Sequence, residues 1–462
     1  MKELLQSIVA AHPGFLELRY HRRVQNSFFA QKGRVEDASS RTRAGVGVRA
    51  LVDGAWGFSS TSDLSRDGID RAVDRAVTAA RDLARADGRK IAPLPPTTLA
   101  RANHVGDDFD TLLAQPLGDK LSRVMDLERA TRESSSRIHT ASSMYAEIFE
   151  EKSIVTTDGA AASYRIVRPE LRVAAFAEKD GAQVVGRNSV GVQGGWNCLF
   201  NHQTAQGIAE RTAKQAVDQL DAPHVPGGVK TVILAPSIVG LLSHEAIGHT
   251  VEADFVLAGS VAAGKIGQMV ASEHVTLCDS ANSEYESGAC GTLPFDDEGV
   301  PAQRTTIIQS GRLVSYLHNR ETAAEFGVAP TGNARAWEYS DEPLVRMRNT
   351  YIEPGTMSLD EMIAGVEDGY LLDNPGSGQA DATGEFMFGA GYAIEIKHGR
   401  LGRIFREVTI SGVAFEMLRT VDAVSREFRW DLGSGYCGKW QPAKVDAGGP
   451  YLRCQVMLGG RQ

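Results

Sequence analysis

The clearest helical pattern in the first half of the chain follows Ser65. Apolar residues recur there every three or four positions over about four turns, which is typical of a helix with one buried face. Ser65 comes just before the first of them and is expected to cap the helix. Upstream, residues 45–51 and 55–59 alternate small and apolar side chains around the turn Asp53-Gly54, which predicts a β-hairpin. The apolar helical positions are Ile69, Ala72, Val73, Ala76, Val77, Ala80, Leu83 and Ala84.

The remaining patterns of the first half predict two more helices around a group of strands. Helical spacing returns over residues 117–132 and 203–220, and strands joined by turns are expected between them, over 142–194. The proline-rich segment 91–96 predicts a stiff linker. A second Pro- and Gly-rich segment, 221–228, is the clearest boundary. We therefore expect an N-terminal domain over residues 1–222 and a second domain over residues 223–462.

The second half opens with a buried strand over residues 231–235. Pro236 then starts a helix that is expected to run over 237–254. From 274 to 458 the pattern indicates short strands and Gly-rich turns, with one further helix near 358–367. The predicted fold class is α+β: an N-terminal α/β domain followed by a C-terminal domain rich in antiparallel β-sheet.

Composition narrows the class of protein and its partners. Hydrophobic residues make up 42% of the 462 positions and the net charge is −9, as in an ordinary globular protein of several domains. A negative balance argues against nucleic-acid binding, which needs clustered Lys and Arg. No stretch approaches the ~20 apolar residues that a membrane-spanning helix needs. Residues 1–13 fit an amphipathic first helix better than a secretion signal, so we expect a cytoplasmic protein without a membrane partner.

The cysteines do not form the pattern of a disulfide framework. They are odd in number and widely spaced, which favours a reducing compartment and leaves any one thiol free to bind a metal. The five are Cys198, Cys278, Cys290, Cys437 and Cys454.

The most distinctive chemistry lies in residues 244–249, which read HEAIGH. In the familiar metallopeptidase helix two histidines are four residues apart, whereas His244 and His249 are five apart. On an ideal α-helix this spacing turns them roughly 140° away from each other. They could share one metal ion only if the turn were locally unwound or formed a π-bulge. Gly248 is where such a distortion is expected to meet the least steric resistance.

The residue types in this segment suit a hydrolytic metal site. Imidazole nitrogen is a good ligand for Zn²⁺. Glu245 lies beside the first histidine, where it could take a proton from metal-bound water and later protonate the leaving amine. The alternative is a chance match, because this His-Glu-x-x-x-His pattern arises by accident in roughly one or two chains per hundred of this composition. A helix histidine is more often a structural residue.

A catalytic zinc site usually needs a third protein ligand and one open position. Cys437 is the most distinctive candidate, since glycines flank it and Lys439 would favour its thiolate. The alternative for Cys437 is a small apolar residue in a turn. Glu252 and Asp254 are interpreted as acceptors that orient the histidines, or else as polar residues of a solvated helix end. Other candidates for the third ligand are Glu252 and Asp254 themselves, on the same helix, and the distant residues His274, His318, His398 and the remaining cysteines.

These segments together resemble the TldD/PmbA family of metallopeptidases, from about Gly45 to Gly438. The sequence HEAIGHTVEAD resembles the metal-binding helix of the TldD branch, and GVGVRALVDGAWGFSSTSDLS resembles the N-terminal hairpin and helix of the family. Four later blocks resemble the family in the same order: TGNAR (331–335), VRMRNTYIEPG (345–355), TGEFMFGA (383–390) and GYCGK (435–439).

The resemblance implies a two-part subunit that dimerises around an enclosed chamber. It implies one Zn²⁺ per chain, held by His244, His249 and Cys437, with Glu245 as the base. Extended, unfolded peptides are the implied substrates, paired with strand edges beside the metal. The implied assembly is a homodimer or a heterodimer with a metal-free PmbA-like subunit.

Four further polar residues are candidates for holding the substrate backbone or the oxyanion. For Asn333, Arg346 and Asn349 the alternative role is hydrogen bonding within turns and strand edges. His318 is a candidate donor to the transition state, or else a structural residue. Two other functions stay open: hydrolysis of a small natural-product amide or thiol conjugate, and a non-catalytic partner subunit with a vestigial site. The four candidates are His318, Asn333, Arg346 and Asn349.

Overall fold

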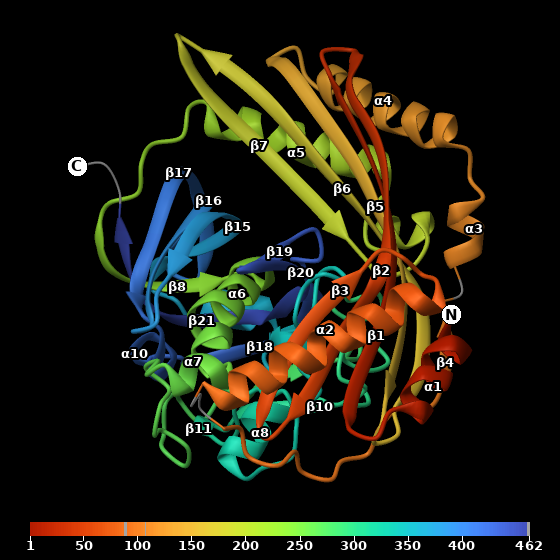
Figure 1. Ribbon diagram of the computed structural model, residues 1–462. Helices are drawn as coiled ribbons and strands as arrows, with labels where there is room; N and C mark the ends of the chain where they lie inside the picture. The colour runs from red at the N-terminus through yellow and green to blue at the C-terminus, as the bar shows by residue number, and fades with distance from the viewer. Residues whose placement is uncertain (87–89, 107, 460–462) are drawn as a thin grey trace.

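The computed structural model describes residues 1–86, 90–106 and 108–459 (Figure 1). The first half of the chain forms a seven-stranded sheet with the order β3-β2-β1-β5-β6-β4, in which β7 also pairs with β6. All its pairings are antiparallel except that of β4 with β6. The strands are β1 (Phe15–Gln31), β2 (Arg34–Val52), β3 (Ala55–Thr61), β4 (Asn103–Val105), β5 (Ile138–Thr156), β6 (Ala161–Lys179) and β7 (Ala182–Gly191).

Helices cover this first sheet where the apolar pattern predicts them. In α2 the Ser65 hydroxyl accepts the backbone N–H of Gly68, which confirms the predicted cap. Ile69 and Ala72 of this helix pack against Val48 of the predicted hairpin. Figure 1 shows α2 across β1–β3, and α4 and α5 along the long strands β5–β7. The helices of this half are α1 (Lys2–Ala11), α2 (Arg66–Arg85), α3 (Phe109–Leu113), α4 (Leu117–Glu133) and α5 (Ala205–Gln219).

The second half is built on a ten-stranded sheet, part of which closes on itself. β21 pairs with β17, β17 with β16, β16 with β15, β15 with β8, and β8 again with β21, so five strands form a closed barrel. From β21 the sheet continues through β14, β9, β10 and β11, and β18 also pairs with β21. The strands of the ten-stranded sheet are β8 (Gly228–Leu234), β9 (Leu277–Ser280), β10 (Arg304–Gln309), β11 (Arg312–Leu313), β14 (Asn349–Ile352), β15 (Asp368–Ala380), β16 (Glu385–Lys397), β17 (Arg400–Val413), β18 (Ala423–Trp430) and β21 (Asp446–Gly459).

The structure confirms the α+β class and corrects details of the second half. Four of its strands run 13 or 14 residues, where short strands were expected. Besides the expected helix α9 (Leu359–Ala364), it contains α8 (Arg320–Phe326) and α10 (Ala414–Arg419). Both missed helices make fewer than two full turns, too few to show a period in the sequence. Residues 90–102 form no helix or strand, as expected of a linker. The predicted boundary after 222 lies between the two sheets and stays a prediction.

The segment that carries the histidines changes conformation several times. α6 (Pro236–Leu242) packs on β21, and a Cβ on Gly240 would lie 2.8 Å from the Ala447 carbonyl group. A π-helical turn (Ser243–Gly248) and a 3₁₀ turn (His249–Val251) follow. Glu252 is extended, and α7 (Ala253–Leu257) begins after it. The single helix expected over 237–254 is therefore wrong, because the chain breaks at Glu252.

Buried ion pairs join the two halves of the molecule. Arg49 of β2 binds Glu17 of β1 at 2.9 Å and Glu298 of the second half at 2.5 Å. Lys152 of β5 binds Asp297 at 2.9 Å. Charges removed from water are stable only when paired and hydrogen-bonded, so these contacts fix how the halves meet. In the described parts of the chain, each helix is too short or too polar to span a bilayer.

The Arg49 contacts generate a prediction for stability. Arg49→Ala leaves two buried carboxylates without their cation and should lower the free energy of unfolding by roughly 3–5 kcal/mol, measured by urea denaturation. The control is Arg66→Ala, which removes an exposed pair with Asp70 and should change that free energy by less than about 1 kcal/mol. Equal losses in the two variants would contradict the role given to Arg49.

Candidate metal centre

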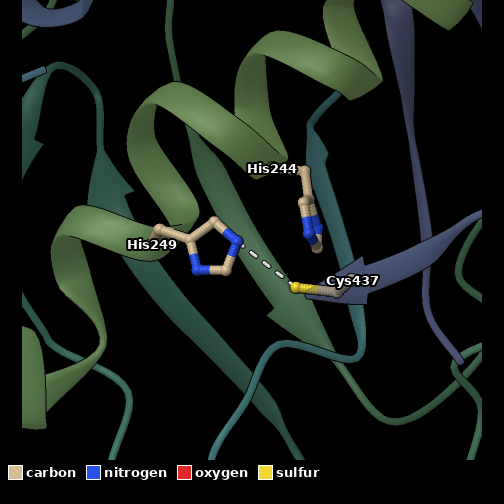
Figure 2. A group of neighbouring side chains, drawn as sticks. All are labelled: His244, His249 and Cys437. Carbon is tan, nitrogen blue, oxygen red and sulfur yellow. Dashed lines mark hydrogen bonds between the residues drawn. The ribbon is translucent and has the colours of Figure 1, made fainter. Parts of the chain in front are cut away.

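Three potential metal ligands converge from distant parts of the chain (Figure 2). His244 lies in the π-helical turn, His249 begins the 3₁₀ turn after it, and Cys437 lies on β19 (Tyr436–Lys439). One potential ligand atom from each residue lies within 4.8 Å of the others. His249 Nε2 is 3.3 Å from Cys437 Sγ, and the two imidazole centroids are 5.2 Å apart. Within the described ranges, no other His, Cys, Asp or Glu residues form such a group of three.

The π-helical turn is what lets the two histidines meet. The backbone N–H of His249 donates to the carbonyl oxygen of His244, the i→i+5 bond of a π-helix. That bond brings residues five apart onto one face, which an α-helix would not do. The predicted distortion is confirmed, but the reason for Gly248 differs. Its φ of −54° is ordinary, and a Cβ there would lie 2.0 Å from Met347 Sδ, so any larger residue would have to displace that side chain.

A buried arginine holds the hairpin that carries Cys437. Arg346 donates to the carbonyl oxygens of Cys437 and Gln441, each at 2.7 Å. These two residues belong to β19 and its partner β20 (Gln441–Lys444). The guanidinium therefore bridges both strands of the hairpin, which fixes the thiol relative to the histidines. In this structure Arg346, a candidate for holding substrate, positions the Cys437 backbone.

Glu252 orients the second histidine. Its Oε2 accepts from His249 Nδ1 at 2.9 Å, which assigns the ring proton to Nδ1 and leaves Nε2 facing Cys437. Lys439 Nζ lies 3.1 Å from the same carboxylate oxygen and 2.7 Å from Asp254 Oδ1. Asp254, which was also expected to orient a histidine, thus binds the lysine instead. Lys439 in turn contacts these carboxylates and not the thiolate it was expected to favour.

The three candidate ligands shift one another's pKa values. Burial raises the pKa of the Cys437 thiol, but the two imidazoles outweigh burial and hold this pKa well below its ordinary value. Burial lowers the pKa of His244, but the Cys437 thiolate raises it above its ordinary value. For His249 burial is outweighed by Glu252 and Cys437, so its pKa is well above the usual value. Burial raises the pKa of Glu252, but His249 and Lys439 outweigh burial, so this pKa lies below its ordinary value.

The three residues fit a divalent metal such as zinc. A thiolate and two imidazoles are a donor set that zinc prefers. Both ring nitrogens of His244 are buried and make no hydrogen bond in the described structure, an arrangement that metal coordination would resolve. The Cys437 thiolate raises the proton affinity of both imidazoles, and a metal cation can replace those protons. Glu245 Oε2 lies 3.8 Å from His249 Nε2 on a side chain that is 34% exposed, so it borders the accessible side of the group.

The other predicted residues lie outside the group of three. His318 binds Thr322 Oγ1 through Nδ1 at 3.2 Å. Burial lowers the pKa of His318 to about 4, so it is neutral at pH 7. Asn333 binds Asp279 and the Arg346 carbonyl, and Asn349 accepts the N–H of Gly291. These buried contacts join strands and turns within the second half and match the alternative role given for these residues. His274 and His398 are exposed.

The structure also gathers two aromatic residues at the site that the sequence did not reveal. The Phe255 ring centroid is 6.2 Å from that of His249, and Trp440 is 5.9 Å from Phe255. Phe255 follows the turns that carry His244 and His249, and Trp440 follows Cys437 by three residues. Their closeness in sequence to the predicted ligands was the available signal. The direction of the Phe255 side chain could not be predicted, because it depends on the break in the helix at Glu252.

Two imidazoles and a thiolate that meet beside a glutamate carboxylate are the groups that a metal-dependent hydrolase needs. Comparison with known proteins gives the same class. The chain matches PmbA/TldA metallopeptidase domain 1 over residues 16–80, the central domain over 110–220 and the C-terminal domain over 227–460. The chain belongs to the PmbA/TldD family of metallopeptidases.

Individual relatives match along nearly their whole length. A metalloprotease of Methanothermobacter thermautotrophicus is 32% identical over 441 residues, covering 94% of this chain and 93% of that protein. A zinc metalloprotease TldD homolog of Saccharolobus solfataricus is 27% identical and covers 96% of each chain. The crystal structure of TldE from Thermococcus kodakarensis is 18% identical, has a TM-score of 0.81 and covers 99% of both chains, which shows a shared fold.

The orientation of His249 by Glu252 can be tested through metal affinity. Glu252→Ala removes the acceptor of the Nδ1 proton and should weaken zinc binding by roughly 10- to 100-fold, measured by competition with a chromophoric chelator. Glu367→Ala, which removes an exposed carboxylate beside His398, is the control and should bind zinc like the wild type. Wild-type affinity in Glu252→Ala would show that this carboxylate does not support the site.

Proposed function

We propose that this metallopeptidase uses one zinc ion per chain to hydrolyse amide bonds of extended or unfolded peptides. His244, His249 and Cys437 would hold the ion, and Glu245 would act as the base. The observation that carries the proposal is the π-helical turn, which places both imidazoles against the thiolate with Glu245 beside them. The name of the Saccharolobus solfataricus relative supports the choice of zinc.

The chain's own residues account for the proton transfers. A bound zinc ion supplies Lewis acidity, which polarises a carbonyl group and lowers the pKa of water to about 7. Glu245 accepts the proton of the attacking water on its carboxylate and returns it to the nitrogen of the leaving amine. Glu252 keeps His249 in one orientation, and Arg346 keeps the Cys437 hairpin in place. Glu245 need not bind the metal to perform this work.

Glu245 separates catalysis from metal binding. Glu245→Gln should retain one zinc per chain and the wild-type circular dichroism spectrum, because it removes a base and not a ligand. Its hydrolysis of reduced, carboxymethylated casein should fall by roughly 10²- to 10⁴-fold, the usual contribution of a general base. The measurement is the rate of appearance of new amino termini.

Three outcomes would contradict the proposal. Undiminished casein hydrolysis in Glu245→Gln would refute the role of this residue. Turnover of short amide conjugates by the wild type, with casein left intact, would instead favour a small-molecule amidohydrolase. Absence of zinc from the purified wild-type chain would favour the non-catalytic partner subunit.

We also propose that the chain works as a dimer in the cytoplasm, with a second copy or with a metal-free PmbA-like subunit. The proposal follows from the family resemblance of the sequence, which implies a dimer. Light scattering of the purified chain should give twice its 49.7 kDa if it forms a homodimer. A monomer that becomes a dimer only with an added PmbA-like subunit would select the heterodimer, and a monomer under both conditions would contradict the proposal.

A further inference from the structure

Trp440 has the most exposed large hydrophobic side chain in the described parts of the chain. It is 83% exposed and lies three residues after Cys437. A tryptophan buries more apolar area than almost any other side chain when it finds a partner, so leaving it in water forgoes a large stabilisation. The folded chain alone gives no use for this indole.

The backbone at Trp440 also disfavours a bulky residue. Lys439 and Gln441 are paired across the hairpin, and Trp440 alone connects them with a φ of 60°. Glycine and asparagine adopt this left-handed conformation most readily, whereas a large side chain is strained there. Strained residues concentrate at functional sites. Both exposure and backbone strain therefore point to a role for the indole outside folding.

A line of aromatic rings connects Trp440 to the metal centre. Its ring centroid lies 5.9 Å from that of Phe255 at an interplanar angle of 53°. Phe255 lies 6.2 Å from the ring of His249. Lys439 Nζ stands 4.2 Å from the centre of the Phe255 ring, and Glu252 and Asp254 hold that ammonium in place. The half-buried Phe255 is thus fixed, and its ring continues the apolar surface from the ligand to the exposed indole.

The distances limit which part of a substrate could touch this surface. The two centroid separations place the indole no more than about 12 Å from the His249 ring. An extended peptide advances ~3.3 Å per residue. Trp440 and Phe255 can therefore meet a side chain within about three residues of the bond that is cleaved.

The charges around Phe255 indicate which side chain would bind. The Lys439 ammonium already occupies one face of the ring, which disfavours a second cation from a basic substrate residue. Two carboxylates neutralise that ammonium, so an acidic substrate residue gains little attraction. Aromatic and large aliphatic side chains carry neither penalty and bury the most apolar area.

We propose that Trp440 and Phe255 form an apolar subsite for an aromatic or large aliphatic side chain of the peptide substrate. This inference rests on the proposed peptidase function and adds a preference to it. Trp440 would contact a residue near the scissile bond without taking part in the proton transfers. The indole would be covered when the substrate is bound, which accounts for its exposure in the free chain.

The test measures peptide binding in the absence of turnover. The probes are twelve-residue peptides of Gly, Ser and Ala that carry one Phe, Leu, Ala or Lys, with that residue moved along the peptide. Isothermal titration of the zinc-loaded Glu245→Gln protein should give dissociation constants about tenfold lower for the best Phe and Leu peptides than for the Ala peptide. Adding Trp440→Asn should abolish this difference, because asparagine tolerates the left-handed turn but supplies no apolar surface. Trp440→Phe should preserve most of it.

The control is Met387→Ala in the same Glu245→Gln background. Met387 is 57% exposed on β16, and its loss should leave the preference intact. A Phe preference that survives Trp440→Asn would overturn the proposal, as would equal binding of all four peptides. If Trp440→Asn loses zinc, Trp440→Gln replaces it, and the same loss of preference is required.

Two further results separate this inference from the function on which it rests. Casein hydrolysis by the wild type with no side-chain preference would overturn the subsite and leave the peptidase function standing. A dimer that dissociates in Trp440→Asn while the peptide preference persists would show that the indole is covered by a second subunit, and this too would overturn the subsite.

Discussion

The candidate metal centre depends on one backbone hydrogen bond, from the N–H of His249 to the carbonyl oxygen of His244. This bond joins residues that are five apart instead of four. It therefore widens one turn and brings together two imidazoles that an α-helix would separate. A π-helical turn is less stable than α-helix, so the surrounding structure has to hold it. Met347 packs where Gly248 has no side chain, and buried α6 fixes the start of the turn against β21.

Buried charged residues hold Cys437 and His249 in position. Arg346 binds the backbone of the Cys437 hairpin, and Lys439 joins that hairpin to Glu252, which orients His249. A buried carboxylate and a buried ammonium are stable here because each satisfies the other. The same contacts fix Phe255 below Lys439, so the geometry of the ligands and the proposed substrate surface depend on one network.

The sequence predicted features that depend on neighbouring residues. The hairpin around Asp53-Gly54, the helix capped by Ser65 and the distorted turn between the histidines follow from local spacing, and the structure confirms each of them. Short helices such as α8 were not predicted, because one or two turns are too short to show a helical period in the sequence. The closed barrel was not predicted either. It depends on the pairing of β8 with β21, which are more than two hundred residues apart, and no local pattern encodes such a pairing.

The site shows the same division between local and distant contacts. The residues alone left Cys437 as one candidate among several, and only the resemblance to a family selected it. Lys439 could not be assigned to Glu252 and Asp254 without knowing that the chain breaks at Glu252. The most direct test is X-ray absorption at the zinc edge of the purified chain. The account predicts two imidazole nitrogens and one sulfur per zinc, with the sulfur lost in Cys437→Ser; a zinc ion with no sulfur neighbour in the wild type would contradict it.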